Sequence, residues 1–76
     1  MKRRLPVLRP REVLRALERG GFFIRHATGS HYILKHPDYP ALRVTLPFHR
    51  RDLKRRTLES IIEQAGFSAE AFLELL

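Results

Sequence analysis

The stretch GFFIRHATGSHYILKHPDYPALRVTL, residues 21–46, decides the fold. Apolar and polar residues alternate in three runs, 22–26, 30–36 and 42–46, and a period of two predicts β-strands. Turn-forming residues separate the runs, at 27–29 and again at 36–40. The stretch therefore predicts an antiparallel hairpin followed by a third strand.

The side-chain pattern also predicts a register for the hairpin. A three-residue turn at 27–29, with Gly29 at positive φ, keeps apolar residues opposite one another. The opposed pairs are then Ile24 with Tyr32, Phe22 with Leu34 and Arg25 with His31. One face of the sheet is apolar, and the other, called here the open face, is expected to carry Phe23, Arg25, His31, Ile33, Lys35, Arg43 and Thr45.

The flanking segments predict helices. Residues 10–19 place apolar side chains on one helical face and end at two glycines, which suit a helix C-terminus. Thr57 is expected to cap a second helix over 57–66, and Ser68 a short last helix over 68–76. The prediction is an α+β domain of order α-β-β-β-α, in which a three-stranded antiparallel sheet has its helices on one face.

Length and composition narrow the class of protein. A chain of 76 residues is expected to form a single domain with a thin core, residues 1–9 being a basic N-terminal arm. The absence of cysteine excludes disulfides and cysteine-based zinc sites. No apolar run suits a signal peptide or a membrane span, so we expect a soluble, cytoplasmic protein with no membrane partner.

Charge is distributed unevenly along the chain. All fifteen Lys and Arg residues lie within positions 1–56, against four acidic residues, and that part carries +11. Residues 57–76 hold four Glu and no base, and carry −4. A small basic domain of this kind favours a polyanionic partner, most often nucleic acid. The alternative is a basic surface that has no specific ligand.

The open face predicts a chemistry. Arg25, Lys35 and Arg43 suit phosphate groups, and His31 among them can take or give a proton near neutral pH. RNA carries its own nucleophile, the 2′-hydroxyl, so its cleavage needs proton transfer and charge stabilisation but no metal. From the residues alone, a surface histidine without a role is the commoner interpretation.

Other kinds of site are less well supported. The expected register turns His26 and His36 inward and His31 outward, so the three histidines do not converge on a metal. Ser30 and His31, as strand neighbours, are expected on opposite faces, which disfavours a serine hydrolase. A basic loop forms either a second nucleic-acid patch or a solvated surface: Arg50, Arg51, Lys54, Arg55 and Arg56.

Several motifs together resemble a known family. Gly29-Ser30-His31 follows Gly21-Phe22 and precedes His36-Pro37-Asp38, and the second half contains Asp52-Leu53-Lys54, Thr57-Leu58 and the run from Ile61 to Ser68. In order and spacing these resemble the HicA-type toxins, small mRNA interferases of toxin–antitoxin systems. The resemblance covers about residues 10–76. One departure is Arg56, where the family often has Gly.

The resemblance implies a fold like that of a double-stranded RNA-binding domain and a ribonuclease acting on mRNA without a cofactor. It implies that His31 is catalytic and that a HicB-type antitoxin covers the active face. We expect a monomer when free and a hetero-oligomer with the antitoxin. Gly29 would let the RNA backbone approach closely, and Ser30 would position a phosphate through its backbone N–H. The alternatives are a non-catalytic double-stranded RNA-binding module and a basic protein-interaction domain.

Overall fold

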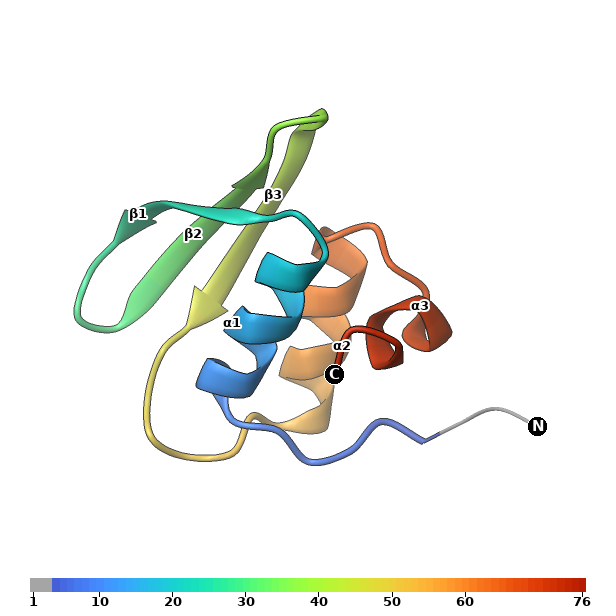
Figure 1. Ribbon diagram of the computed structural model, residues 1–76. Helices are drawn as coiled ribbons and strands as arrows, with labels where there is room; N and C mark the ends of the chain where they lie inside the picture. The colour runs from blue at the N-terminus through green and yellow to red at the C-terminus, as the bar shows by residue number, and fades with distance from the viewer. Residues whose placement is uncertain (1–3) are drawn as a thin grey trace.

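The computed structural model describes residues 4–76 (Figure 1). Its elements are α1 Pro10–Arg19, β1 Phe23–Ala27, β2 His31–His36, β3 Tyr39–Pro47, α2 Arg55–Gln64 and α3 Ala69–Leu73. The strands form one antiparallel sheet in the order β1-β2-β3, and the helices lie on one side of it (Figure 1). The predicted α+β architecture is confirmed. The first three residues of the predicted arm lie outside the described part of the chain.

The core lies between the inner face of the sheet and the helices. Both α1 and α2 contact β3, and α3 contacts α2. Side chains with no more than 1% exposure come from the sheet and from all three helices: Leu34, Val44 and Leu46 from the sheet, Val13 and Leu17 from α1, Leu58 and Ile61 from α2, and Phe72 from α3. Leu8, ahead of α1, is also buried, and its carbonyl accepts a hydrogen bond of 2.8 Å from the Leu53 N–H. Residues 4–9 are therefore attached to the body at Leu8.

The helix ends agree with the sequence in part. The bounds of α1 are those expected, and Gly21 after it has a φ of 97°, which favours glycine. Ser68 caps α3 as predicted, because its hydroxyl accepts the Ala71 N–H at 3.1 Å. The expected cap at Thr57 is wrong, since α2 begins at Arg55. Buried Leu53 anchors the chain just before that point, and the helix starts from there. The last helix ends at Leu73, before the expected 76.

The pairing of β2 with β3 sets the two faces of the sheet. Leu34 lies opposite Val44, both fully buried, and His31 lies opposite Pro47 on the open face. The third strand runs from 39 to 47, longer than the predicted 42–46, because Tyr39 already pairs with His36. The free edge of β3 is partly covered, since the Thr45 N–H donates to Oε1 of Gln64 at 2.9 Å.

The pairing of β1 with β2 corrects the predicted register. Ile24 lies opposite Leu34 and Ala27 opposite Tyr32, with an irregularity between Ile24 and His26. Arg25 is the extra residue of this β-bulge, so the alternation of side chains is displaced by one after it. The loop between the strands is 28–30 and not 27–29. The expected positive φ at Gly29 is also wrong, because only Gly21 and Gly66 have one in the described chain.

None of the helices within residues 4–76 is long and apolar enough to cross a lipid bilayer.

Candidate active site

The open face carries most of the residues that the sequence placed there. The pairings put Phe23, His31, Ile33, Lys35, Arg43 and Thr45 on this face. Arg25 has no partner in the ladder because it is the bulge residue, and the predicted Arg25–His31 pair does not form. His26, expected to point inward, lies opposite Ile33 and therefore shares the open face. The bulge thus adds a second histidine to the open face and leaves Arg25 outside the ladder.

His31 is the first residue of β2 and is exposed. The hairpin loop fixes its backbone through Thr28. The Thr28 side-chain oxygen accepts the His31 N–H at 3.0 Å, and the Thr28 N–H donates to the His31 carbonyl at 2.8 Å. These bonds close the turn and fix the backbone from which the imidazole projects. Thr hydroxyls can make such hydrogen bonds to nearby backbone groups in turns.

The ring of His31 is oriented by its neighbour. Its Nδ1 lies 3.0 Å from Oγ of Ser30. The expected separation of these two side chains is wrong, because Ser30 belongs to the loop and not to the strand. A hydroxyl both donates and accepts, so Ser30 can pair with Nδ1 whether or not that nitrogen carries a proton. In residues 4–76 no carboxylate bonds to the other ring nitrogen, and a serine–histidine–acid triad is not formed.

Gly29 lies beside this pair at the tip of the loop. A Cβ built on it would meet no atom within 4 Å, so a ligand backbone has room to approach. The Ser30 N–H donates to Oγ1 of Thr28 at 3.3 Å. That N–H, which the sequence assigned to a phosphate, already has a partner inside the loop.

Lys35 and Arg43 lie opposite each other at the far end of the open face. Lys35 is four residue steps from His31 along β2, which corresponds to about 13 Å at roughly 3.3 Å per residue. The Lys35 ammonium donates to the Pro40 carbonyl at 2.6 Å. These two cations are thus on the expected face, but they do not surround the histidine.

Cations nearer the loop come from elsewhere in the chain. Arg9 and Arg11, at the start of α1, line a hollow together with Gly29 and Arg50. Sequence reasoning placed Arg50 in a basic loop and gave no site role to Arg9 or Arg11. Only the tertiary fold brings these three arginines together, and no local spacing signals it. The rest of the basic loop lies outside this hollow, and Arg55 forms an ion pair with Glu59 at 3.7 Å.

His36 has a structural position. Its Nδ1 accepts the Asp38 N–H at 3.1 Å, so the neutral ring carries its proton on Nε2, which donates to the Gly20 carbonyl at 3.1 Å. The ring also packs edge-on against Phe22. Within residues 4–76, no three His, Asp or Glu side chains are placed to hold a metal ion.

Comparison with known proteins identifies the family. Residues 10–67 match the family model described as HicA toxin of bacterial toxin-antitoxin. Since the match spans most of the chain, the protein belongs to the HicA toxin family. It is a toxin of a toxin–antitoxin system, and membership implies a cognate antitoxin. No curated protein is found to match the chain.

Proposed function

We propose that this HicA-family toxin is an endoribonuclease that cleaves mRNA without a metal ion, with His31 as its catalytic residue. The observation that supports this most is the setting of His31. Its imidazole is exposed at the end of the open face, its backbone is held by Thr28, and its Nδ1 is paired with Ser30. The other ring nitrogen, Nε2, is then the one that contacts the RNA.

The reaction proposed uses the RNA's own nucleophile. The 2′-oxygen attacks the adjacent phosphorus and its proton passes to a base, while the bond to the 5′-oxygen breaks and that oxygen takes a proton from an acid. The products are a 2′,3′-cyclic phosphate and a 5′-hydroxyl end. His31 serves as the base or the acid, and the Ser30 hydroxyl keeps the ring oriented in either protonation state.

The second proton transfer needs a second group, and His26 is the candidate that the register supplies. The Thr28 N–H donates to the His31 carbonyl, so Thr28 lies opposite His31 just after β1 ends, and His26, on β1, is two residues before it. Diagonal neighbours of this kind are about 7–8 Å apart. Two imidazoles at that separation can stand on either side of one phosphate.

The predicted RNA contacts divide into two groups along the face. Gly29 and Ser30 lie beside His31, where the reacting nucleotide would bind. Lys35 and Arg43 would hold the RNA backbone farther along the sheet, and exposed Arg25 at the bulge would meet it between the two. Guanidinium and ammonium groups suit phosphate oxygens and carry no sequence information.

The cognate antitoxin is proposed to be HicB-like and to act by covering this face. Phe23, on the open face opposite Lys35, is 45% exposed, and Ile33 on the same face is partly exposed. Large exposed apolar side chains beside a polar site favour a protein lid. The free toxin would be a cytoplasmic monomer, and the inhibited form a hetero-oligomer with the antitoxin.

The test of the proposed function is the chemistry of the cut ends. The full chain should cleave a single-stranded RNA in the presence of EDTA and leave 2′,3′-cyclic phosphate and 5′-hydroxyl ends. The same sequence with 2′-deoxyribose at each nucleotide should bind but remain whole. Binding of RNA without any cleavage would favour the non-catalytic RNA-binding module instead. Activity that EDTA abolishes and a divalent ion restores would contradict the metal-independent mechanism.

A further inference from the structure

A basic hollow of about 700 Å³ lies at the loop end of the sheet. Three separate parts of the chain line it: the start of α1, the hairpin loop, and the segment that follows β3. The lining residues are Arg9, Arg11, Gly29, Phe48, His49 and Arg50. We call it the loop hollow.

The ladder between β2 and β3 places the loop hollow at the same end of the sheet as His31. His31 lies opposite Pro47, and the Phe48 N–H continues the pairing by donating to the Ser30 carbonyl at 2.8 Å. The segment after β3 therefore runs beside the hairpin loop. Phe48 also stacks on Tyr32, with ring centroids 4.2 Å apart and planes at 4°. The wall formed by this segment is thus attached to the sheet.

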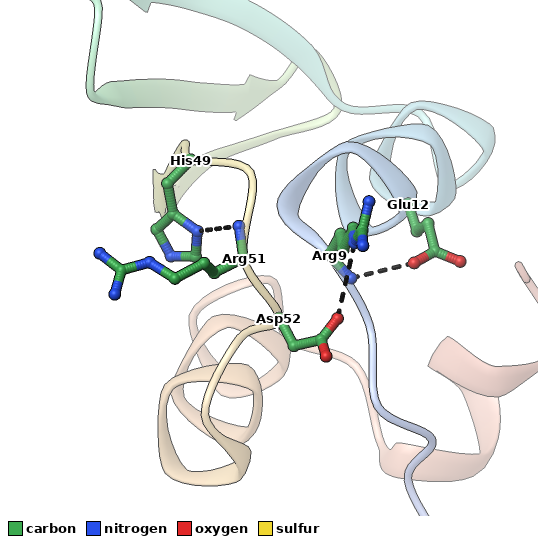
Figure 2. Close-up of polar contacts among 5 residues, drawn as sticks. All are labelled: Arg9, Glu12, His49, Arg51 and Asp52. Atoms are coloured by element: carbon green, nitrogen blue, oxygen red, sulfur yellow. Dashed lines mark hydrogen bonds and ion pairs between the residues drawn. The ribbon is translucent and has the colours of Figure 1, made fainter.

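The charge of the loop hollow is largely uncompensated. Arg9 forms an ion pair with Asp52, whose Oδ1 lies 3.7 Å from Nε (Figure 2). Among the described residues, neither Arg11 nor Arg50 forms an ion pair. Three guanidinium groups line the concave surface, and Asp52, the partner of Arg9, is not part of its lining. Such a surface favours an anionic ligand, and the planar guanidinium matches two phosphate oxygens at once.

His49 adds a further hydrogen-bond donor to the hollow. Its Nδ1 accepts the Arg51 N–H at 3.1 Å, within the loop (Figure 2). The neutral ring therefore has its proton on Nε2, where it can donate but not accept. A donor fixed in this way suits an oxygen of a phosphate. It does not suit the removal of a proton from a 2′-hydroxyl through Nε2.

We propose that the loop hollow is a subsite for an RNA phosphate, the one next to the phosphate that reacts at His31. The inference rests on the proposed function, since it takes RNA as the ligand. Arg11 and Arg50 bind the phosphate oxygens and His49 donates through Nε2. The subsite thereby positions the neighbouring nucleotide on the open face.

The experiment measures binding and cleavage by full-length Arg11→Ala/Arg50→Ala. The matched control is Arg4→Ala/Arg15→Ala, which removes the same charge from two exposed residues outside the hollow and outside the basic loop. Binding is read by anisotropy of a fluorescein-labelled single-stranded RNA, with His31→Ala added to each protein so that the RNA stays whole. The hollow variant should bind about tenfold more weakly than the control, and its log–log salt slope should fall by about 0.7 for the one phosphate released.

His49 is tested with two substitutions in the protein that retains His31. His49→Ala should raise KM about tenfold, and His49→Gln, which keeps an N–H donor, should recover most of the loss. Neither should change the shape of the pH profile of kcat. Loss of one limb of that profile in both variants would assign His49 to proton transfer and overturn its role as a donor in the subsite.

The outcomes separate this inference from the proposed function. A wild-type protein that never cleaves RNA refutes the endoribonuclease, while the anisotropy still decides whether the hollow binds phosphate. A wild type that cleaves, with hollow and control variants of equal affinity and equal salt slope, refutes the subsite alone. Weakened binding of the cognate antitoxin with unchanged RNA binding would assign the hollow to the antitoxin and also refute the subsite.

Discussion

The backbone N–H of His31 donates a hydrogen bond of 3.0 Å to the side-chain oxygen of Thr28. The same hydroxyl donates to the His31 carbonyl at 3.2 Å, and it accepts the Ser30 N–H at 3.3 Å. A single side chain thus closes the loop that presents the proposed catalytic residue. Within residues 4–76 the Thr28 hydroxyl bonds only to Ser30 and His31, so its role is to hold this loop.

Thr28→Val is expected to lower kcat by about tenfold, because valine has the shape of threonine but lacks the hydroxyl that fixes the loop. Thr28→Ser keeps the hydroxyl and should retain most of the activity. The free energy of unfolding should fall by about 1 kcal/mol in the Val variant, the usual net worth of such hydrogen bonds. Steady-state cleavage kinetics and urea unfolding check both effects. An unchanged kcat in Thr28→Val would show that the loop does not need this residue to position His31.

His26→Ala should remove one limb of the pH profile of kcat, because the bulge places this imidazole diagonally across from His31. The rate is expected to fall about 100-fold, the lower end of the range for general acid–base catalysis. His26→Gln, which cannot exchange a proton, should behave in the same way. The profile is measured at saturating RNA concentration. A profile that keeps both limbs would assign the second proton transfer to another group.

The general architecture could be predicted from the sequence because its signals are local. Alternating strands, the two glycines after α1 and the Ser68 cap all act within a few residues, and each is found in the structure. The inner and outer faces of β2 and β3 followed from alternation, since no bulge interrupts the pairing between His31 and Lys35.

The register of β1 could not be obtained in this way. A bulge adds one residue to one strand, and parity arguments assume that there is none. The signal that was available is the run Phe22-Phe23-Ile24, where apolar residues follow one another without alternation. The loop hollow was also beyond sequence reasoning, because Arg9, Gly29 and Arg50 meet only after the sheet has folded over α1.

Gly21→Ala should destabilise the protein, whereas Gly29→Ala should not. At Gly21 a Cβ would lie 2.5 Å from Nε2 of His36, and the φ of 97° is unfavourable for alanine. We expect a loss of more than about 1 kcal/mol in the free energy of unfolding. At Gly29 the Cβ meets nothing within 4 Å, so stability should be unchanged while RNA affinity falls if the backbone of the RNA approaches there. Thermal unfolding and RNA binding are measured for both variants. Equal stability of the two would contradict the placement of His36 against Gly21.

The antitoxin should protect the open face from hydrogen exchange. Comparison of the free toxin with its complex is expected to show slower exchange in residues 22–36 and 42–46, because these segments form the sheet whose open face carries the site and exposed Phe23. Association should slow as salt rises, since the toxin is basic and its partner is expected to be acidic. Protection confined to 57–76, with ribonuclease activity retained in the complex, would exclude inhibition by occlusion.

The most direct test of the central claim is the cleavage rate of purified His31→Gln beside the wild type, with EDTA present in both reactions. His31 is exposed, so its replacement should leave the free energy of unfolding within about ±0.5 kcal/mol of the wild type. The account predicts that the wild type cleaves the RNA and that the variant is at least about 100-fold slower, because the group that transfers the proton has been removed. A folded His31→Gln protein that cuts RNA at the wild-type rate would contradict the assignment of His31 as the catalytic residue.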